Sequence, residues 1–409
     1  MQEGLIVYVH VPFCSSKCHF CYWTSPVPTS ELVRNDKHSA DYATAVVRQI
    51  RELRAHIKGS PAMRMIYFGG GTPSLMEARD LAAILDAIHE EFPKHTGFGD
   101  TTLEVAPETV HLEKLRHLRA AGFDRISFGF QSLNADRVRH IGRAHSADEA
   151  INAFQMAREA GFSNLNIDLI LGFPDETDQE WKETLDKALE LSPDHVSLYV
   201  YKVVPGTVMA RQLERGESQP TPHAVSVRRY LEARDRITSL GYKEYMFQMF
   251  AREDKRCFCD QDYFTQDCDF VGFGAGGHSL LGGYLMGHSP NLASYLQQPG
   301  FDFRYPIGNS AGAIHYKLIE MLHTDGGIDP VRFQRRFRLS LNDARQRHPQ
   351  VEAFLSILES GAVAPGSNGG WRFKDSNERA HWLSTQPQQF ETSPPADEAG
   401  KVVQIAAVS

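Results

Sequence analysis

Residues 11–21 read Val11-Pro-Phe-Cys14-Ser-Ser-Lys-Cys18-His-Phe-Cys21 and follow a predicted strand at 5–11. The cysteines have the spacing Cys-x3-Cys-x2-Cys, so one short loop presents all three thiolates together. Such a set can bind three irons of a [4Fe–4S] cubane and leave the fourth iron open to a ligand with amino and carboxylate groups. The alternatives are three unrelated thiols or a zinc site without its fourth ligand. The spacing and the position after a strand favour the cluster.

The composition is that of an ordinary globular protein. Hydrophobic residues make up 42% and charged residues 23% of the 409 residues. The formal net charge of -8 gives no electrostatic reason to expect a nucleic-acid partner. No apolar run approaches the roughly 20 residues needed to cross a bilayer, and the first residues lack the basic start of a secretion signal. We therefore expect a cytoplasmic protein with neither a nucleic-acid nor a membrane partner.

Short β-branched runs alternate with amphipathic helical patterns through the first half of the chain. This alternation predicts parallel strands with crossover helices, and hence an active site at the C-terminal ends of the strands. The predicted fold class is α/β, a partial (β/α)6 barrel with extra strands and a small C-terminal domain. The expected barrel strands are Leu5–Val11, Met65–Gly69, Thr102–Val105, Arg125–Phe130, Asn164–Ile170 and His195–Val200.

Four regions follow from the same patterns. The partial barrel takes residues 1–220, and residues 221–305 extend it with added strands expected near 242–250 and 270–274. A winged-helix-like domain is expected at 306–385, followed by a flexible tail at 386–409. Because the chain is acidic overall, this domain is expected to act as a lid or a substrate-docking unit, not as a DNA-binding one.

A glycine-rich segment, Tyr67-Phe-Gly-Gly70-Gly71-Thr72-Pro-Ser, follows the second predicted strand. Glycines there let the backbone approach a bound amino acid closely, and exposed amides can hold its carboxylate. Combined with the cysteine motif, this segment resembles the radical S-adenosylmethionine (SAM) superfamily. The resemblance implies a [4Fe–4S] cluster at Cys14, Cys18 and Cys21 that cleaves SAM reductively.

More narrowly, the chain resembles the coproporphyrinogen-dehydrogenase-like, or HemN-like, branch of that superfamily. The resemblance extends over roughly residues 7–278, and most of its markers fall at a predicted strand end or in the following loop. These markers are Tyr8-Val-His-Val-Pro-Phe-Cys14, Leu103-Glu-Val-Ala-Pro107, Ile126-Ser-Phe-Gly-Phe-Gln-Ser132, Gly142-Arg-Ala-His145, Asn166-Ile-Asp-Leu-Ile170 and Gly272-Phe-Gly-Ala-Gly276.

Members of this branch can hold two SAM molecules in one cavity, and the resemblance implies which residues surround each. The SAM on the cluster would contact Tyr8, Phe20, Gly70, Glu104 and the backbone near His278. The second SAM would contact Gly71, Thr72, Gln131, Arg143, Asp168 and Lys202.

The residue types suit these tasks, although some have ordinary structural explanations as well. Arg143 can hold a carboxylate through two hydrogen bonds, yet an isolated arginine near a helix start is usually a solvated surface charge. Asp168 lies inside an apolar run, where a carboxylate needs a partner or a ligand. Glu104 lies in a strand and can likewise hold an ammonium or a ribose diol.

Departures from two subgroups narrow the expected function. HemW-like heme chaperones carry a His-Asn-x-x-Tyr-Trp signature, whereas the equivalent stretch here is Cys259-Asp-Gln-Asp-Tyr-Phe264. True coproporphyrinogen oxidases add a fourth cysteine and a longer N-terminal arm, whereas Tyr22 follows Cys21 here. The remaining resemblance is to class C radical SAM methyltransferases, including cyclopropanating ones.

The resulting hypothesis is transfer of a methyl or methylene unit from the second SAM to an sp2 carbon of a planar natural product. The alternatives are a HemW-like heme chaperone, a HemN-like tetrapyrrole oxidase and a heme-degrading enzyme. The expected partners are a small planar or aromatic substrate, either free or bound to a carrier or a peptide, and a reductant such as flavodoxin or ferredoxin. A general base is sought among Tyr199, Tyr201 and Lys202, which we expect on the last barrel strand.

The sequence allows two interpretations of a second cysteine group, Cys257, Cys259 and Cys268. Three cysteines within a dozen residues could ligate an auxiliary cluster or form a redox pair. Free cysteines are also common in protein cores, and no adjacent residue is a convincing fourth ligand.

Overall fold

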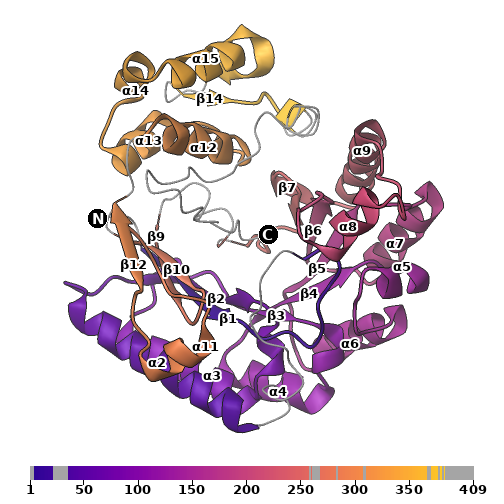
Figure 1. Ribbon diagram of the computed structural model, residues 1–409, viewed down its shortest axis with the longest axis vertical. Helices are drawn as coiled ribbons and strands as arrows, with labels where there is room; N and C mark the ends of the chain where they lie inside the picture. Colours follow the sequence, from indigo (N-terminus) through magenta and orange to yellow (C-terminus); the bar gives the residue numbers. More distant parts are fainter. Residues whose placement is uncertain are drawn as a thin grey trace.

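A computed structural model describes residues 4–21, 36–257, 259, 268–281, 284–306, 310–365, 370–375, 378–379 and 382. In this part of the chain, one sheet has the strand order β12-β11-β10-β9-β1-β2-β3-β4-β5-β6-β8-β7. Figure 1 shows this sheet with helices α2, α3, α4 and α6 along one side and the C-terminal helices on the far side. The order begins and ends with different strands, so the sheet is an open, partial barrel.

Six parallel strands form the centre of the sheet. They are β1 (Leu5–Val11), β2 (Met63–Gly70), β3 (Thr101–Val105), β4 (Arg125–Gln131), β5 (Leu165–Leu171) and β6 (His195–Val200). The segments between them contain helices α2 (Asp36–His56), α3 (Ala78–Glu91), α4 (Leu112–Ala121), α5 (Ala135–His140), α6 (Ala147–Glu159) and α7 (Asp178–Glu190). The predicted partial (β/α)6 barrel is therefore confirmed.

The added strands extend both edges of the sheet. Strand β9 (Asp269–Phe273) pairs in parallel with β1. Beyond β9, the strands β10 (His278–Leu281), β11 (Tyr284–Gly287) and β12 (Phe303–Pro306) each pair antiparallel with the strand before. At the other edge, β8 (Met249–Ala251) pairs with β6 and with β7 (Lys243–Met246). The prediction of one strand near 242–250 was wrong, because Gln248 has a left-handed φ of 72° and the chain turns back there as a hairpin.

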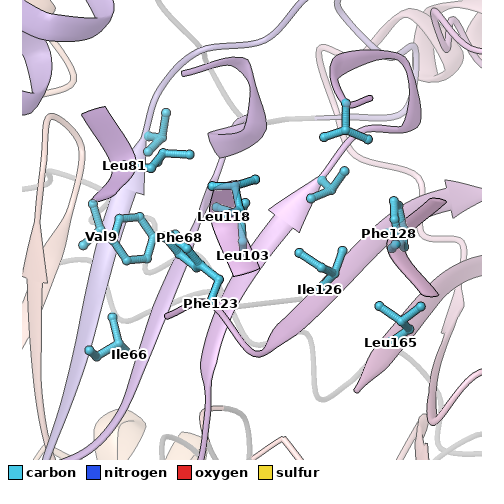
Figure 2. Close-up of a cluster of buried hydrophobic side chains, with 14 of the residues drawn as sticks. Val9, Ile66, Phe68, Leu81, Leu103, Leu118, Phe123, Ile126, Phe128 and Leu165 are labelled. Atoms are coloured by element: carbon cyan, nitrogen blue, oxygen red, sulfur yellow. The ribbon is translucent and has the colours of Figure 1, made fainter. Parts of the chain in front are cut away.

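The two faces of the sheet follow the alternation of side chains along each strand. Figure 2 shows Val9, Ile66, Phe68 and Leu103 packed with residues of the helical layer such as Leu118 in the main core. The intervening residues, including Tyr8 and Tyr67, point to the inner face of the partial barrel. Side chains that alternate with the core residues therefore line the inner face of the partial barrel.

The C-terminal part has a core of its own. Its elements are α12 (Ala311–Leu322), α13 (Pro330–Phe337), α14 (Leu341–Arg347), α15 (Pro349–Ile357) and the hairpin of β13 (Ala364–Pro365) and β14 (Trp371–Arg372). Helices followed by a small hairpin are expected of a winged-helix-like domain. In chain order, α8 (Val208–Glu214) and α9 (His223–Ser239) come between β6 and β7, and α11 (Leu292–Gln297) comes between β11 and β12.

None of the described helices is long and apolar enough to cross a membrane. The tail predicted at 386–409 lies outside the described residues.

Candidate active site

The three motif cysteines lie in the loop that leaves the C-terminal end of β1, and all three thiols are partly buried. The backbone N–H of Cys21 donates to the carbonyl of Cys18 at 3.2 Å, which curls the loop. Burial raises the pKa of the Cys14 thiol to about 11, although a hydrogen bond with Thr72 opposes this shift. Iron binding to this thiol therefore releases a proton.

The glycine-rich segment after β2 packs directly against the cysteine loop. The N–H of Gly71 donates to the carbonyl of Val11 at 2.8 Å. A Cβ added at Gly71 would lie 2.4 Å from the carbonyl oxygen of Phe13 and 3.0 Å from Sγ of Cys14. Only glycine fits this contact, and the two loops therefore form one surface.

Glu104 is held in place beside this surface. Its Oε1 accepts a hydrogen bond from the Tyr67 hydroxyl at 2.9 Å, and its Oε2 accepts one from the N–H of Gly70 at 3.1 Å. Tyr8 lies nearby: its ring stacks 6.1 Å from that of Tyr67, and burial and the Glu104 charge raise its pKa. Glu104, Gly70 and Tyr8, which the family resemblance assigns to the SAM on the cluster, are therefore brought together.

A second group of polar side chains comes from β4, β5 and the loop after α5. Gln131 ends β4 with a left-handed φ of 66°, and its Oε1 is buried without a hydrogen-bond partner. The Nε of Arg143 is likewise buried and unpartnered, while its Nη2 donates to the Gly129 carbonyl at 2.6 Å. A bound polar ligand could provide the hydrogen-bond partners that these two buried atoms lack.

Asp168 on β5 belongs to the same inner face. Its carboxylate accepts hydrogen bonds from Nδ2 of Asn166 at 2.7 Å and from Oγ of Ser127 at 3.2 Å. Burial raises its pKa, and hydrogen bonds from Ser197 and Asn166 act in the opposite direction. Asp168 is thus a fixed, half-buried acceptor that suits a ligand ammonium or hydroxyl.

The chemical groups of these residues fit the expected cluster and SAM. Three thiols in one loop match three irons, and the glycine segment provides close backbone approach. The carboxylates of Glu104 and Asp168 and the unpartnered atoms of Gln131 and Arg143 match the ammonium, hydroxyl and carboxylate groups of SAM.

The candidates for the general base do not form one group. Strand β6 ends at Val200, so Tyr201 and Lys202 follow the strand, and the prediction that they lie on it was wrong. Tyr199 packs beside Tyr245 and Met249, whereas the Tyr201 ring lies 5.3 Å from that of Phe173.

Of these three, the Tyr201 hydroxyl is buried without a partner, and burial raises its pKa. Lys202 is exposed to solvent. Phe20 joins the Tyr201 group, since its ring lies 5.6 Å from that of Phe173.

His278 lies on β10 with its ring stacked 5.3 Å from that of Phe270, which in turn stacks 5.6 Å from that of Tyr8. His10, to which no role was assigned from the sequence, is hydrogen-bonded through Nδ1 to the Tyr8 hydroxyl at 3.2 Å. Burial lowers the pKa of His10 to about 3 and that of His278 to about 4, so both imidazoles are neutral at pH 7. The signal was available, because Tyr8 and His10 are two residues apart and share one face of β1.

A carboxylate beside the cysteine loop was also missed. Glu108 accepts hydrogen bonds from Ser15 at 2.8 Å and from Nδ1 of His145 at 3.2 Å. Burial by itself would raise the pKa of Glu108, but the His145 hydrogen bond, the Arg143 charge and the Ser15 hydrogen bond lower it to about 2. Nothing in the local sequence pattern distinguishes Glu108 from a surface glutamate.

Cys257, Cys259 and Cys268 are buried in an apolar cluster with Ile6, Tyr8 and Met65 on the inner face. The interpretation of these cysteines as an auxiliary cluster or a redox pair stays a prediction. Of the stretch 259–264 that replaces the heme-chaperone signature, the structure describes Cys259.

Comparison with known proteins agrees with this arrangement. The radical SAM superfamily model matches residues 8–188. The heme chaperone HemW of Bacillus subtilis is 27% identical over 340 residues, which cover 82% of this chain and 87% of the relative. HemW of Haemophilus influenzae is 32% identical over 283 residues, with coverage of 68% and 70%.

The oxygen-independent coproporphyrinogen III oxidase of Salmonella typhimurium is 30% identical over 309 residues, which cover 73% of this chain and 66% of the relative. The solved structure of coproporphyrinogen III oxidase (HemN) from Escherichia coli shares the fold, with a TM-score of 0.74 at 23% identity and coverage of 94% and 90%. The protein uses a [4Fe–4S] cluster and SAM, as this superfamily does. The chain belongs to the HemN-like branch of the radical SAM superfamily.

Proposed function

We propose that this protein is an enzyme that cleaves SAM reductively at a cluster bound by Cys14, Cys18 and Cys21 and holds a second SAM in the same cavity. When bound, the cluster supplies the electron that splits SAM into methionine and a 5′-deoxyadenosyl radical. The protein's own contribution is to position the ligands and to exclude water and oxygen.

The observation that carries the proposal is the pair of unpartnered buried atoms, Gln131 Oε1 and Arg143 Nε. They belong to a set of polar residues separate from the one around Glu104, whose carboxylate accepts hydrogen bonds from Tyr67 and the Gly70 amide. Two sets of this kind support two ligands of the same chemistry.

Two candidates for the acceptor have separate support. The relatives are a coproporphyrinogen III oxidase and heme chaperones, and their names favour a tetrapyrrole as the ligand. Tetrapyrrole chemistry therefore fits the relatives better than one-carbon transfer does. The departures after Cys21 and at 259–264 favour methyl or methylene transfer to a planar acceptor, since this chain lacks the residues that mark the oxidase and the chaperone. In both reactions the protein is an enzyme.

The test is SAM binding and turnover by anaerobically reconstituted protein. We expect two SAM molecules per chain. Arg143→Ala and Asp168→Ala should weaken one of them ten- to a hundredfold, since each loses a charge-assisted contact of ~1.5–3 kcal/mol. Both variants should still form 5′-deoxyadenosine at the cluster. One SAM per chain in the unmodified protein would contradict the two-ligand proposal.

Methyl-deuterated SAM then separates the acceptor candidates. One-carbon transfer predicts S-adenosylhomocysteine and deuterium in 5′-deoxyadenosine, with a planar aromatic acceptor present. Oxidation of added coproporphyrinogen III predicts neither, because the hydrogen then comes from the acceptor. Tight stoichiometric heme binding without any SAM cleavage would identify a chaperone and overturn the enzyme proposal.

A further inference from the structure

Arg143 contacts the cysteine loop as well as the second set of ligand residues. Its Nη1 donates to Sγ of Cys18 at 3.4 Å, while its Nη2 donates to the Gly129 carbonyl at 2.6 Å. The guanidinium is always charged and has N–H groups on three nitrogens in a fixed plane. Its position is therefore set from two sides.

The segment that carries Arg143 is docked on the cysteine loop by several further contacts. The N–H of His19 donates to the Ile141 carbonyl at 2.9 Å, and Oγ of Ser16 donates to the Gly142 carbonyl at 3.3 Å. Gly142 has a left-handed φ of 75°, and a Cβ there would lie 2.7 Å from Cδ2 of His19. The cysteine loop and the segment 141–143 are thus in close contact.

Glu108 links the cysteine loop to the same segment at a second place. It accepts hydrogen bonds from Ser15 in the cysteine loop and from His145, which lies two residues after Arg143. The His145 side chain has no exposed surface, and that of Glu108 is 18% exposed. Arg143 is therefore held against Cys18 from both sides.

We propose that Arg143 donates a hydrogen bond to the Cys18 sulfur in the loaded enzyme and thereby raises the reduction potential of the cluster. The physical reason is that an N–H donor and a positive charge stabilise the more negative, reduced form of a thiolate-bound cluster. This inference deepens the proposed function, because the residue expected to hold the second SAM is also a positioning residue for the cluster.

The test is a redox titration of anaerobically reconstituted protein without SAM, followed by electron paramagnetic resonance of the reduced cluster. Arg143→Gln removes the charge and the forked donor, and Arg143→Lys keeps the charge only. Arg139→Gln is the matched control, since it removes a charge from α5, where the side chain is 76% exposed and pairs with Asp136. We expect the potential to fall in Arg143→Gln, to fall less in Arg143→Lys and to stay at the wild-type value in Arg139→Gln.

A wild-type potential in Arg143→Lys, or equal shifts in Arg143→Gln and Arg139→Gln, would overturn the inference, because charge alone would then explain the data. If iron analysis shows that Arg143→Gln does not hold the cluster, the comparison of Arg143→Lys with wild type decides. SAM is absent from this titration, so failure of the two-SAM proposal would leave the expected order of potentials unchanged.

Discussion

Asp168 illustrates how single residues build this site, because a chain of buried polar groups fixes its carboxylate. Asn166 donates to Asp168 and accepts from Nδ1 of His195 at 2.7 Å. His195 in turn is hydrogen-bonded through Nε2 to the hydroxyl of Tyr245 at 2.8 Å. Burial lowers the pKa of His195 well below its ordinary value, so the imidazole is neutral and relays orientation without adding charge.

Glu108 gives a prediction about pH at this scale. Its pKa of about 2 in the folded protein lies below the ordinary value of 4.5. A carboxyl with a lowered pKa stabilises the fold above pH 4.5, and this stabilisation is lost as the pH falls towards 2. The variant Glu108→Gln should lack this pH-dependent contribution to the free energy of unfolding, which is at most about 3 kcal/mol.

The measurement is urea unfolding of metal-free protein between pH 7 and pH 3. Wild type should lose more stability on acidification than Glu108→Gln does. Glu52→Gln is the control, because that side chain is 59% exposed and lies 4.0 Å from Arg48. Parallel pH curves for wild type and Glu108→Gln would show that the carboxylate contributes nothing to acid stability.

At the level of strands and helices, local pattern was a good guide for the six barrel strands. Buried parallel strands have nearly continuous apolar runs, and β1 and β6 have the predicted bounds. The pattern could not predict that β9 pairs with β1, because that pairing joins segments more than 250 residues apart. The same reason explains why the contact between Glu108 and His145 was missed, since a contact between distant loops leaves no local signal.

Sequence reasoning did identify the glycine-rich segment, and its contact with the cysteine loop yields a prediction. Gly71→Ala should lower the iron content after reconstitution well below the expected four per chain. The added Cβ would overlap the Phe13 carbonyl, which is backbone and cannot shift cheaply. Gly97→Ala is the matched control, because the nearest atom to a Cβ there is Nδ1 of His95 at 3.6 Å. Equal iron content in the two variants would contradict the close packing of the two loops.

On the scale of the whole molecule, a buried ion pair joins the C-terminal part to the edge of the sheet. Arg379, which is 2% exposed, lies with its Nη2 3.8 Å from the buried carboxylate of Glu244 on β7 and donates to the backbone carbonyl of Glu244 at 3.1 Å, while its Nη1 pairs with Asp325 of the C-terminal part. The Glu244 carboxylate also accepts hydrogen bonds from Arg234 at 2.8 Å and Tyr230 at 2.6 Å. Strand β7 forms a hairpin with β8, and β8 pairs with β6, the strand that leads to Tyr201 and Lys202. The C-terminal part is therefore anchored close to the candidate base residues.

Arg379→Met should therefore loosen the C-terminal part. Removing one partner of a buried charge pair costs about 3–5 kcal/mol, and the remaining Arg234 contact places this case at the low end. Limited proteolysis should cut the variant faster between the sheet and α12, and unfolding should separate into two transitions. Arg372→Met is the control, because Arg372 is exposed on β14. A single transition at the wild-type midpoint would show that the ion pair does not hold the two parts together.

The central claim is reductive SAM cleavage by a cluster on the loop of Cys14, Cys18 and Cys21, and 5′-deoxyadenosine formation tests it most directly. Anaerobically reconstituted wild-type protein, given SAM and a chemical reductant, should form 5′-deoxyadenosine measurable by mass spectrometry. The triple variant Cys14→Ala, Cys18→Ala, Cys21→Ala should form none, while a variant with Cys257, Cys259 and Cys268 changed to serine tests whether the second cysteine group takes part. Wild-type amounts of 5′-deoxyadenosine from the triple alanine variant would contradict the account.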